Sequence, residues 1–535
     1  MGKDESMLGG MQDFELRVST LIDHAAREHP TREIVTRWAD GSETRSDWRT
    51  LSHDAKRLAQ ALERLGVQRG ERVATLAMNH GHHLAAWYAT IGMGAVIHTI
   101  NPRLFDDQLV YIANHAEDRV LLYDRAFQPI VDRLRTRWTS IDHYVVMDDD
   151  GPDGFAALIA PEDGDYDWVT GSEREACMLC YTSGTTGHPK GVLYDHRSIL
   201  LHALLVASPA VLGLSSTAVL LPVVPLFHAA AWGTPFAAPL AGAKLVFSAV
   251  NDAKVLCDLM NREGVTISSG VPTVWLAMFA HIDATGETPR ALRMATIGGS
   301  AAPRAMIARL IDMGVEVKHL WGMTETSPVA TAAAPPPDWQ SWPRERQLDL
   351  LTRQGSVPYG VELVVRDDDG TPLPRDGTSA GRLHIRGPWV IKRYFRAEAD
   401  AIDADGWFDT GDVAVIHPDG TMQITDRSKD VIKSGGEWIS SVELENAAVG
   451  CPGVAEAAAI GISHPKWDER PLLVVVRKPG SDVTARAILD HLAGVVAKWW
   501  LPDGIAFVDT LPHTATGKLL KTALREQFRD YQFAA

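Results

Sequence analysis

The residues at positions 181–191 combine the groups that proteins use to bind a polyphosphate. They read Tyr-Thr-Ser-Gly-Thr-Thr-Gly-His-Pro-Lys-Gly, with three glycines, four Ser and Thr hydroxyls, and one lysine. Glycines let backbone N–H groups approach an anion, hydroxyls add hydrogen-bond donors, and a lysine supplies positive charge. The candidate phosphate-binding residues are therefore Thr182, Ser183, Gly184, Thr185, Thr186, Gly187 and Lys190.

This segment does not match a Walker loop, in which the pattern G-x-x-x-x-G-K-[ST] opens a helix. Pro189 precedes the lysine, and residues 191–194 are typical of a strand that returns beside the one before the segment. The alternative is a flexible Ser/Thr/Gly loop without a ligand. On its own, the segment predicts a polyphosphate bound outside the Walker geometry.

Two cysteines and three histidines have spacings that would suit a metal ion. Cys177 and Cys180 form a C-x-x-C pair, but zinc needs a second pair or nearby histidines, and the two other cysteines are isolated. Residues 176–181 are more typical of a buried strand. The histidines within residues 80–83 fall at a predicted strand-to-helix turn, where we expect them to be solvated or to cap the helix.

The elements that must position these residues alternate between short apolar strands and helical periods from residue 33 onwards. This alternation favours an α/β fold with largely parallel strands in one large multi-sheet body. Strands are predicted at residues 73–78, 120–123, 144–147, 218–221 and 244–247, and helices at 52–65, 84–91 and 305–313.

The pattern changes twice towards the C-terminus. Past about Arg366, short strands alternate with Asp-Gly turns, which indicates a β-rich flank. After the charged residues 426–430, an α+β pattern predicts helices at 441–450 and 485–498 and strands at 456–460 and 472–476. We expect an N-terminal domain at residues 1–426, a connection at 427–430 and a small C-terminal domain at 431–535.

Composition limits the possible classes of protein. The chain has 535 residues, 45% hydrophobic and 22% charged, which is ordinary for a globular protein with at least two cores. The net charge of −16 argues against a nucleic-acid partner, and prolines and glycines interrupt the most apolar stretch, so no membrane span is expected. Four cysteines cannot form a disulfide framework, which favours a reducing compartment, and we expect the cytoplasm.

The segment at 181–191 resembles a motif of the adenylate-forming superfamily, which includes acyl-CoA synthetases, nonribosomal peptide synthetase adenylation domains and luciferases. Further superfamily signatures follow in order along nearly the whole chain. They are Pro225-Leu-Phe-His228, Ile297-Gly-Gly-Ser-Ala-Ala-Pro303, Trp321-Gly-Met-Thr-Glu325, Gly406-Trp-Phe-Asp-Thr-Gly-Asp412, Asp426-Arg427, Lys433-Ser-Gly-Gly-Glu437 and Thr514-Ala-Thr-Gly-Lys518. The resemblance implies a large adenylate-forming domain and a small mobile domain.

The resemblance assigns individual residues to ATP and Mg²⁺. Glu325 would hold Mg²⁺, a hard cation that prefers carboxylate and phosphate oxygens, and Thr324 would hydrogen-bond the α-phosphate. Asp412 would accept hydrogen bonds from the ribose hydroxyls, and Arg427 would add a second polar clamp there. Further nucleotide contacts are implied for Gly299, Ser300, Ala301, Trp321 and Gly322.

An acyl pocket is implied beside the nucleotide. Gly298 and Gly299 would bring the backbone close to the adenine and the acyl chain, where side chains would obstruct, and the alternative is a tight turn without a ligand. His228, a candidate catalytic residue, and Trp232 lie where the superfamily has an aromatic wall over the carboxylate and acyl chain. Packing in the core is the alternative for Trp232.

Two lysines are implied to serve two half-reactions. Lys518 would bridge the carboxylate and the α-phosphate during adenylation, because these two anionic groups repel each other. A solvated surface group is the alternative for this lysine. The small domain would then rotate about Lys429 and bring in Lys433 with the CoA tunnel, whose narrow walls would exclude side chains. The implied tunnel residues are Ser434, Gly435 and Gly436.

These roles predict a ligase that joins a small carboxylic acid to CoA, with ATP consumed to form an acyl-adenylate. Within the adenylate-forming superfamily, the chain looks most like 3-methylmercaptopropionate-CoA ligases and medium-chain fatty acyl-CoA ligases. We favour the former, since a thioether packs well against tryptophan, as alkyl chains also do. The alternatives are loading of a free carrier protein, a luciferase-like oxygenase and a non-catalytic AMP sensor. A homodimer is implied only by the resemblance.

Overall fold

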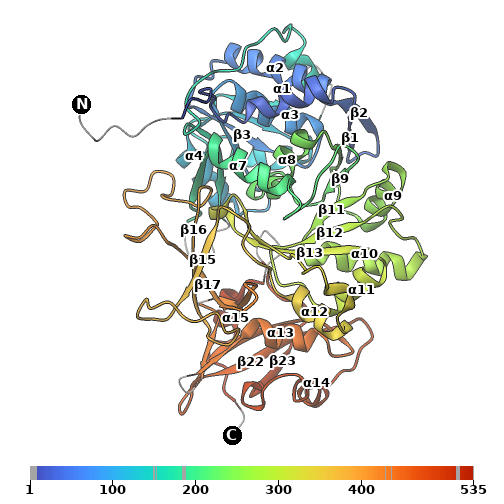
Figure 1. The fold of residues 1–535 in the computed structure, drawn as a ribbon, viewed down its shortest axis with the longest axis vertical. Helices are drawn as coiled ribbons and strands as arrows, with labels where there is room; N and C mark the ends of the chain where they lie inside the picture. The colour runs from blue at the N-terminus through green and yellow to red at the C-terminus, as the bar shows by residue number, and fades with distance from the viewer. Residues whose placement is uncertain are drawn as a thin grey trace.

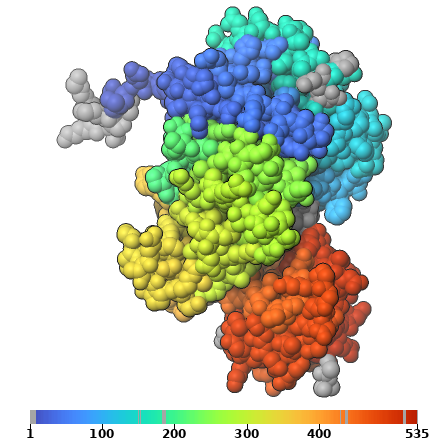
Figure 2. Space-filling model, turned by 90° about the vertical axis from the view of Figure 1, so that its right-hand side faces the viewer, coloured from blue at the N-terminus to red at the C-terminus, as the bar shows by residue number. Residues whose placement is uncertain are grey.

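The computed structural model describes residues 9–148, 151, 153–182, 188–427, 429–434, 437–513 and 519–533. The N-terminal part is built from two mainly parallel sheets with helices packed against them, and an antiparallel sheet lies beside it (Figure 1). The orange-to-red C-terminal residues form a separate lobe below the rest of the chain (Figure 2). The predicted α/β class is therefore confirmed.

The first sheet carries the candidate phosphate segment at its edge. Its six strands have the order β6-β5-β3-β4-β7-β8, and every pair is parallel except β7 with β8. The phosphate segment lies between β7 and the edge strand β8, which pair antiparallel, so the predicted returning strand is confirmed. The strands are β3 (Arg72–Leu76), β4 (Val96–Thr99), β5 (Asp118–Tyr123), β6 (His143–Val146), β7 (Ala176–Tyr181) and β8 (Gly191–Asp195).

The second sheet has eight strands in the order β14-β13-β12-β11-β9-β10-β1-β2, parallel from β13 to β1 and antiparallel at both edges. Its central strands are short apolar runs, as expected for parallel strands buried on both faces. They are β1 (Glu33–Arg37), β2 (Glu43–Asp47), β9 (Val219–Pro222), β10 (Lys244–Ser248), β11 (Ile267–Gly270), β12 (Met294–Ile297), β13 (Glu316–Gly322) and β14 (Val329–Ala332).

Capped, amphipathic helices cover these sheets. The carboxylate of Asp47 accepts a hydrogen bond from the Thr50 N–H at the start of α2, and Asp195 caps α7 in the same way. The helices of the large part are α1 (Ser19–Glu28), α2 (Trp48–Arg64), α3 (Gly81–Gly92), α4 (Asp106–Ala116), α5 (Gln128–Leu134), α6 (Phe155–Ile159), α7 (His196–Ala207), α8 (Thr234–Ala241), α9 (Ala253–Glu263), α10 (Pro272–Thr285), α11 (Arg304–Asp312) and α12 (Arg344–Thr352).

The cysteine pair and the histidine cluster have structural roles in this part. Cys177 and Cys180 are buried, unpaired residues of β7, which confirms the predicted buried strand. His80 accepts a hydrogen bond from the His83 N–H and so caps α3, as predicted. The expectation of solvated histidines is wrong for His80 and His83, which are buried against β3 and the neighbouring turn.

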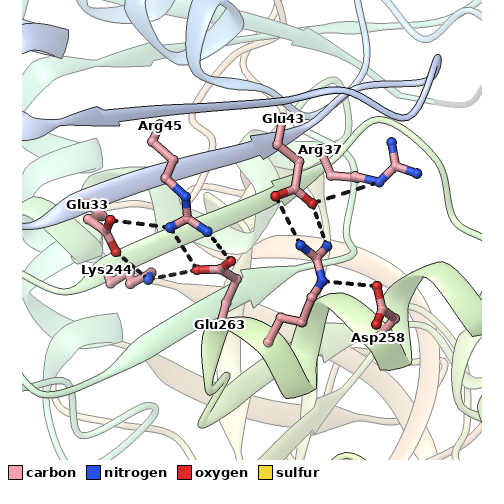
Figure 3. A network of polar contacts seen from close by, with 8 residues as sticks. Glu33, Arg37, Glu43, Arg45, Lys244, Asp258 and Glu263 are labelled. Carbon is pink, nitrogen blue, oxygen red and sulfur yellow. Dashed lines mark hydrogen bonds and ion pairs between the residues drawn. The ribbon is translucent and has the colours of Figure 1, made fainter.

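An ion-pair network fastens the edge strand β2 to the rest of the second sheet. Figure 3 shows Glu263 of α9 between Arg45 of β2 and Lys244 of β10. The Arg45 Nη2 atom lies 2.5 Å and the Lys244 Nζ atom 2.9 Å from the Glu263 carboxylate, whose side chain is only 3% exposed. Such charges on an edge strand also disfavour pairing with other chains.

The predicted β-rich flank is a four-stranded antiparallel sheet in the order β15-β16-β17-β18. Its last two strands carry Asp412 and Arg427, which lie directly opposite each other in the ladder. The sheet therefore positions two of the predicted nucleotide residues. The strands are β15 (Glu362–Arg366), β16 (Gly381–Arg386), β17 (Phe408–Ile416) and β18 (Met422–Arg427).

The C-terminal lobe has its own sheet and its own core, in which Leu444, Val475 and Ile488 are fully buried. The predicted helix at 485–498 is too long, because α14 ends before Gly494. A glycine within a helix is about 1 kcal/mol less favourable than an alanine. The elements are β19 (Ile432–Ser434), β20 (Glu437–Ile439), β21 (Val454–His464), β22 (Asp468–Arg477), β23 (Gly504–Phe507), α13 (Ser441–Val449), α14 (Ala485–Leu492) and α15 (Lys521–Gln527).

Among the described residues, no helix is both long enough and apolar enough to span a bilayer.

Candidate active site

The two ends of the phosphate segment are clamped together. The Thr182 N–H donates to the Lys190 carbonyl over 2.9 Å, and the Lys190 N–H donates to the Thr182 hydroxyl over 3.2 Å. These bonds extend the β7–β8 ladder by one further pair. The predicted contacts Ser183, Gly184, Thr185, Thr186 and Gly187 lie outside the described residues.

Lys190 and Glu325 meet around one tyrosine that the sequence analysis did not single out. The Lys190 Nζ atom lies 4.8 Å from the centroid of the Tyr394 ring, a cation–π distance. The Tyr394 hydroxyl donates a 2.8 Å hydrogen bond to the Glu325 carboxylate. The phosphate segment and the predicted metal ligand are thus neighbours in space.

The Glu325 carboxylate suits a cation. Glu325 is only 6% exposed, and this burial raises the pKa of its carboxyl above the usual value. The hydrogen bond from Tyr394 acts in the opposite direction but is the smaller effect. A bound divalent cation would offset that desolvation, and carboxylate oxygen is a preferred ligand of Mg²⁺. The residue present therefore fits the predicted metal.

Thr324 begins a short turn of 3₁₀ helix, Thr324–Thr326, that carries Glu325. The Tyr194 hydroxyl of β8 donates to the Thr324 carbonyl over 2.6 Å, and the Ile391 N–H donates to the Glu325 carbonyl over 2.8 Å. Contacts from two distant segments fix the backbone of this turn. The Thr324 and Glu325 side chains are therefore held at the end of β13.

Asp412 connects Trp321 with Arg427. The Trp321 indole N–H donates to one carboxylate oxygen over 3.0 Å, and the Arg427 Nε atom lies 2.9 Å from the other. Asp412 is 3% exposed, whereas the Arg427 side chain is half exposed. The structure thus brings together three residues that the sequence predicted for the nucleotide.

The glycines near this cluster are required for close packing. A Cβ atom on Gly298 would lie 3.1 Å from both the Leu320 carbonyl and the Trp232 ring, and Gly299 has a φ of +81°. A Cβ atom on Gly322 would lie 1.8 Å from the Pro328 carbonyl oxygen. Gly322 therefore has a packing role that the sequence analysis did not predict, at the irregularity between β13 and β14. Ser300 and Ala301 follow Gly299 in the loop before α11.

Trp232 lies in a run of four residues, 229–232, whose φ angles are positive, between 44° and 56°, in the left-handed region. Such angles are unfavourable for residues with a Cβ atom, so the surrounding packing must hold them. The ring is 8% exposed and lines a narrow apolar hollow together with Leu320 and Val329. Trp232 is therefore packed in the core at the border of a hollow, and its role in the substrate pocket stays a prediction.

His228 lines a different hollow, beside the phosphate segment. This hollow is shared with Thr182, Tyr181 and Asn101. The two candidate pocket residues His228 and Trp232 thus line separate hollows, His228 just before and Trp232 within one short 3₁₀ turn, Ala229–Gly233.

The C-terminal candidates are held by β22. The Lys433 N–H donates to the Glu469 carboxylate over 2.9 Å, and the Arg470 Nη1 atom donates to the Ser434 hydroxyl over 3.2 Å. Lys429 is an exposed turn residue three positions before the start of β19. Gly435, Gly436 and Lys518 lie outside the described residues.

Comparison with known proteins agrees with this arrangement. Residues 22–395 match the family model "AMP-binding enzyme", and residues 443–518 match "AMP-binding enzyme C-terminal domain". The chain belongs to the AMP-binding enzyme family. Because the larger match spans most of the chain, the family is shown for the protein as a whole.

Three similar proteins define its place in the AMP-binding family. The chain is 48% identical to the 3-methylmercaptopropionyl-CoA ligase of Ruegeria lacuscaerulensis over 98% of this chain and 99% of the relative. It is 46% identical to the medium-chain-fatty-acid–CoA ligase of Ectopseudomonas oleovorans over 98% of each chain. The solved anthranilate CoA ligase AuaEII, in complex with anthranoyl-AMP, has 25% identity and a TM-score of 0.87, covering 96% and 98% of the two chains.

This AMP-binding enzyme is therefore an AMP-forming acyl-CoA ligase. It uses ATP and Mg²⁺ to convert a carboxylic acid into an acyl-adenylate and transfers the acyl group to CoA.

A buried polar network ties the C-terminal lobe of this AMP-binding enzyme to β18. Both the N–H and the hydroxyl of Ser441 donate to Asp426, over 2.5 and 2.9 Å. The Lys521 Nζ atom donates to the same hydroxyl over 2.5 Å and forms a 2.7 Å ion pair with Glu445. The sequence offered no signal for this network, because its members look like ordinary surface residues.

The buried His202, next to Gly233, predicts acid sensitivity of the AMP-binding enzyme. The His202 Nε2 atom accepts the Val329 N–H over 3.0 Å, and burial lowers the pKa of this histidine from 6.5 to about 3. As the pH falls, His202 is protonated in the unfolded chain before it is protonated in the folded protein. The stabilisation from the neutral, buried histidine is therefore complete above pH 6.5 and is lost as the pH falls towards 3. The loss is about 1.4 kcal/mol per pH unit.

The variant His202→Gln keeps an acceptor for the Val329 N–H but cannot take up the proton. Between pH 6.5 and 5, we expect the parent to lose about 2 kcal/mol more unfolding free energy than the variant. Urea unfolding followed by tryptophan fluorescence at both pH values measures the difference. Equal losses in the two proteins would contradict a buried neutral His202.

Proposed function

We propose that the acid used by this ligase is 3-(methylthio)propionate, so that the product is 3-(methylthio)propionyl-CoA with AMP and pyrophosphate. The observation that carries the proposal is the 48% identity, over nearly both full chains, to a 3-methylmercaptopropionyl-CoA ligase. A second candidate is a medium-chain fatty acid, since an enzyme of that name is 46% identical. Loading of a free carrier protein in place of CoA is the third.

The residues around Trp232 support a short, uncharged acyl chain. The nine residues that line this hollow are five aliphatic residues, Trp232, and three that carry a hydroxyl, and none of them is charged. Packing of Trp232 against Gly298 narrows the space further. A polarizable thioether sulfur would make favourable contacts with the tryptophan ring, at about 5 Å. Alkyl chains would also pack there, which is why the two acids must be compared directly.

The adenylation step is assigned to residues around Glu325. Bound Mg²⁺ would neutralise charge on the phosphates as the carboxylate attacks. Glu325 would hold that ion, while Thr182, Lys190 and Thr324, with residues 183–187, would bind the phosphates. Asp412, Arg427 and Trp321 would hold the ribose, with Gly299, Ser300, Ala301 and Gly322 at the adenine side. His228 would face the carboxylate, and Lys518 would bridge it to the α-phosphate.

Since no protein nucleophile takes part, catalysis would rest on positioning and electrostatic stabilisation. Residues 1–426 would form the adenylation domain, and residues 431–535 would form the mobile domain, rotating at Lys429 within 427–430. After rotation, Lys433 and Ser434, with Gly435 and Gly436, would receive the pantetheine arm of CoA. We also propose a homodimer in the cytoplasm, a reducing compartment supported by four buried, unpaired cysteines.

The substrate assignment is tested by kcat/KM values for 3-(methylthio)propionate, butyrate, hexanoate and octanoate with saturating ATP and CoA. We expect the highest value for 3-(methylthio)propionate. A strong preference for octanoate would replace the proposal with the medium-chain fatty acid. AMP release that depends on CoA and not on an added carrier protein would exclude the third candidate.

A further inference from the structure

Two of the three hydroxyl-bearing residues that line the hollow beside Trp232 stand side by side. Ser269 of β11 and Thr296 of β12 are direct partners in the parallel ladder, and both line the hollow. The neighbouring β12 residues Ala295 and Ile297 face the opposite side of the sheet, in a separate hydrophobic cluster. The alternation of a β-strand thus turns Thr296 towards the hollow. The other lining residues are Val206, Val211, Leu212, Trp232, Thr234, Leu320 and Val329.

The Thr296 hydroxyl is a buried donor without a partner. Thr296 is 0% exposed, and within the described part of the chain its hydroxyl oxygen has no hydrogen-bond partner. Nearby hydroxyls are satisfied: Thr234 donates to the Ala231 carbonyl and Ser268 to the Leu221 carbonyl, each over 2.8 Å. Leaving a buried hydroxyl unpaired is unfavourable, so a ligand atom that accepts a hydrogen bond from it is favoured at this position.

The position of Thr296 connects this donor with the reaction. It lies two residues before Gly298, where a Cβ atom would lie 3.1 Å from the Trp232 ring, and that ring also lines the hollow. Trp321 and Glu325 lie on and just after the neighbouring strand β13. Thr296 therefore lies on the same side of the sheet as the Trp232 ring and lines the hollow that this ring borders.

We propose that Thr296 is a specificity-determining residue that donates a hydrogen bond to a heteroatom within the acyl chain. The chemical class it favours is a short acid with a thioether or ether in the chain, over the all-carbon acid of the same length. An alkyl chain leaves the donor unpaired, whereas sulfur is a weak acceptor and ether oxygen a stronger one. This inference rests on the proposed function, because it assumes that the hollow receives the acyl chain.

The test compares acids of equal length in the parent and in Thr296→Val, which removes the hydroxyl at nearly constant volume. The acids are 3-(methylthio)propionate, pentanoate and 3-methoxypropionate. Each acid is used at concentrations below its KM, where the initial rate gives kcat/KM. We expect the variant to lower kcat/KM for the thioether acid about three- to tenfold relative to pentanoate, and for the ether acid at least as much. Thr296→Ser, which keeps a hydroxyl, should restore most of the preference.

Ser268→Ala is the matched control, since it removes a hydroxyl of the same sheet that is already bonded and does not line the hollow. It should leave the ratio of the two kcat/KM values unchanged. An identical ratio in the parent and in Thr296→Val would overturn the inference. If the parent enzyme prefers octanoate, the proposed substrate 3-(methylthio)propionate is wrong instead. The ratio of kcat/KM for 3-(methylthio)propionate to that for pentanoate still reports on Thr296.

Discussion

Lys518→Ala is expected to lower acyl-adenylate formation by about two to three orders of magnitude, the range for losing one preorganised electrostatic donor. The reason is the repulsion between an attacking carboxylate and a polyphosphate, which the proposed bridging ammonium of Lys518 would offset. Formation of the thioester from supplied acyl-adenylate and CoA should survive, because that step no longer joins two anions. Acid-dependent exchange of pyrophosphate into ATP measures the first step, and CoA-dependent AMP release from the acyl-adenylate measures the second.

The flanks of this lysine show why the effect should be local. The Leu520 N–H donates to the Pro512 carbonyl over 2.8 Å, and His513 pairs with Leu519, so the two ends of residues 514–518 are fastened together. Lys478→Ala, at an exposed lysine of the same lobe, is the control and should leave both steps unchanged. Equal loss of both half-reactions in Lys518→Ala would contradict the role assigned to this residue.

Local patterns predicted some strands of the two mainly parallel sheets well, but gave no prediction for β4, β11, β12 or β13. β5 and β10 were found within two residues of their ends, because strands buried on both faces are short apolar runs between polar turns. The end of α14 was predicted six residues too late. Apolar residues continue with helical spacing past Leu492, and the sequence does not show that the next turn leaves the core.

Contacts between distant segments could not be predicted without the motifs. Trp321 and Asp412 are 91 residues apart, and only the order of strands and sheets brings the indole to the carboxylate. Tyr394 gave no signal, since a tyrosine among charged residues does not reveal that its hydroxyl will face Glu325. Gly322 was assigned to the nucleotide, whereas its lack of a side chain is already required by Pro328.

The network around Lys521 is the clearest case of a feature that the sequence hides. A lysine near the C-terminus is usually solvated, but the Lys521 and Glu445 side chains are only 8% and 12% exposed. Burial lowers the pKa of Lys521, but the opposing charges of Glu445, Asp426 and Asp430 outweigh it, so the pKa lies above its usual value. The ammonium is therefore held in its charged form, between α13 and the end of β18.

Lys521→Met is expected to lower the free energy for opening the C-terminal lobe by about 3–5 kcal/mol, the usual cost of removing one partner of a buried ion pair. Methionine fills similar space but leaves Glu445 buried without its cation and Ser441 without a donor. Hydrogen exchange of the peptides that cover α13 and α15 measures the opening free energy. The double variant Lys521→Met/Glu445→Leu should recover most of the loss, since replacing a whole buried pair with apolar side chains is often neutral. If the double variant is no more stable than Lys521→Met, the cost arises from packing around the lysine and not from the stranded carboxylate.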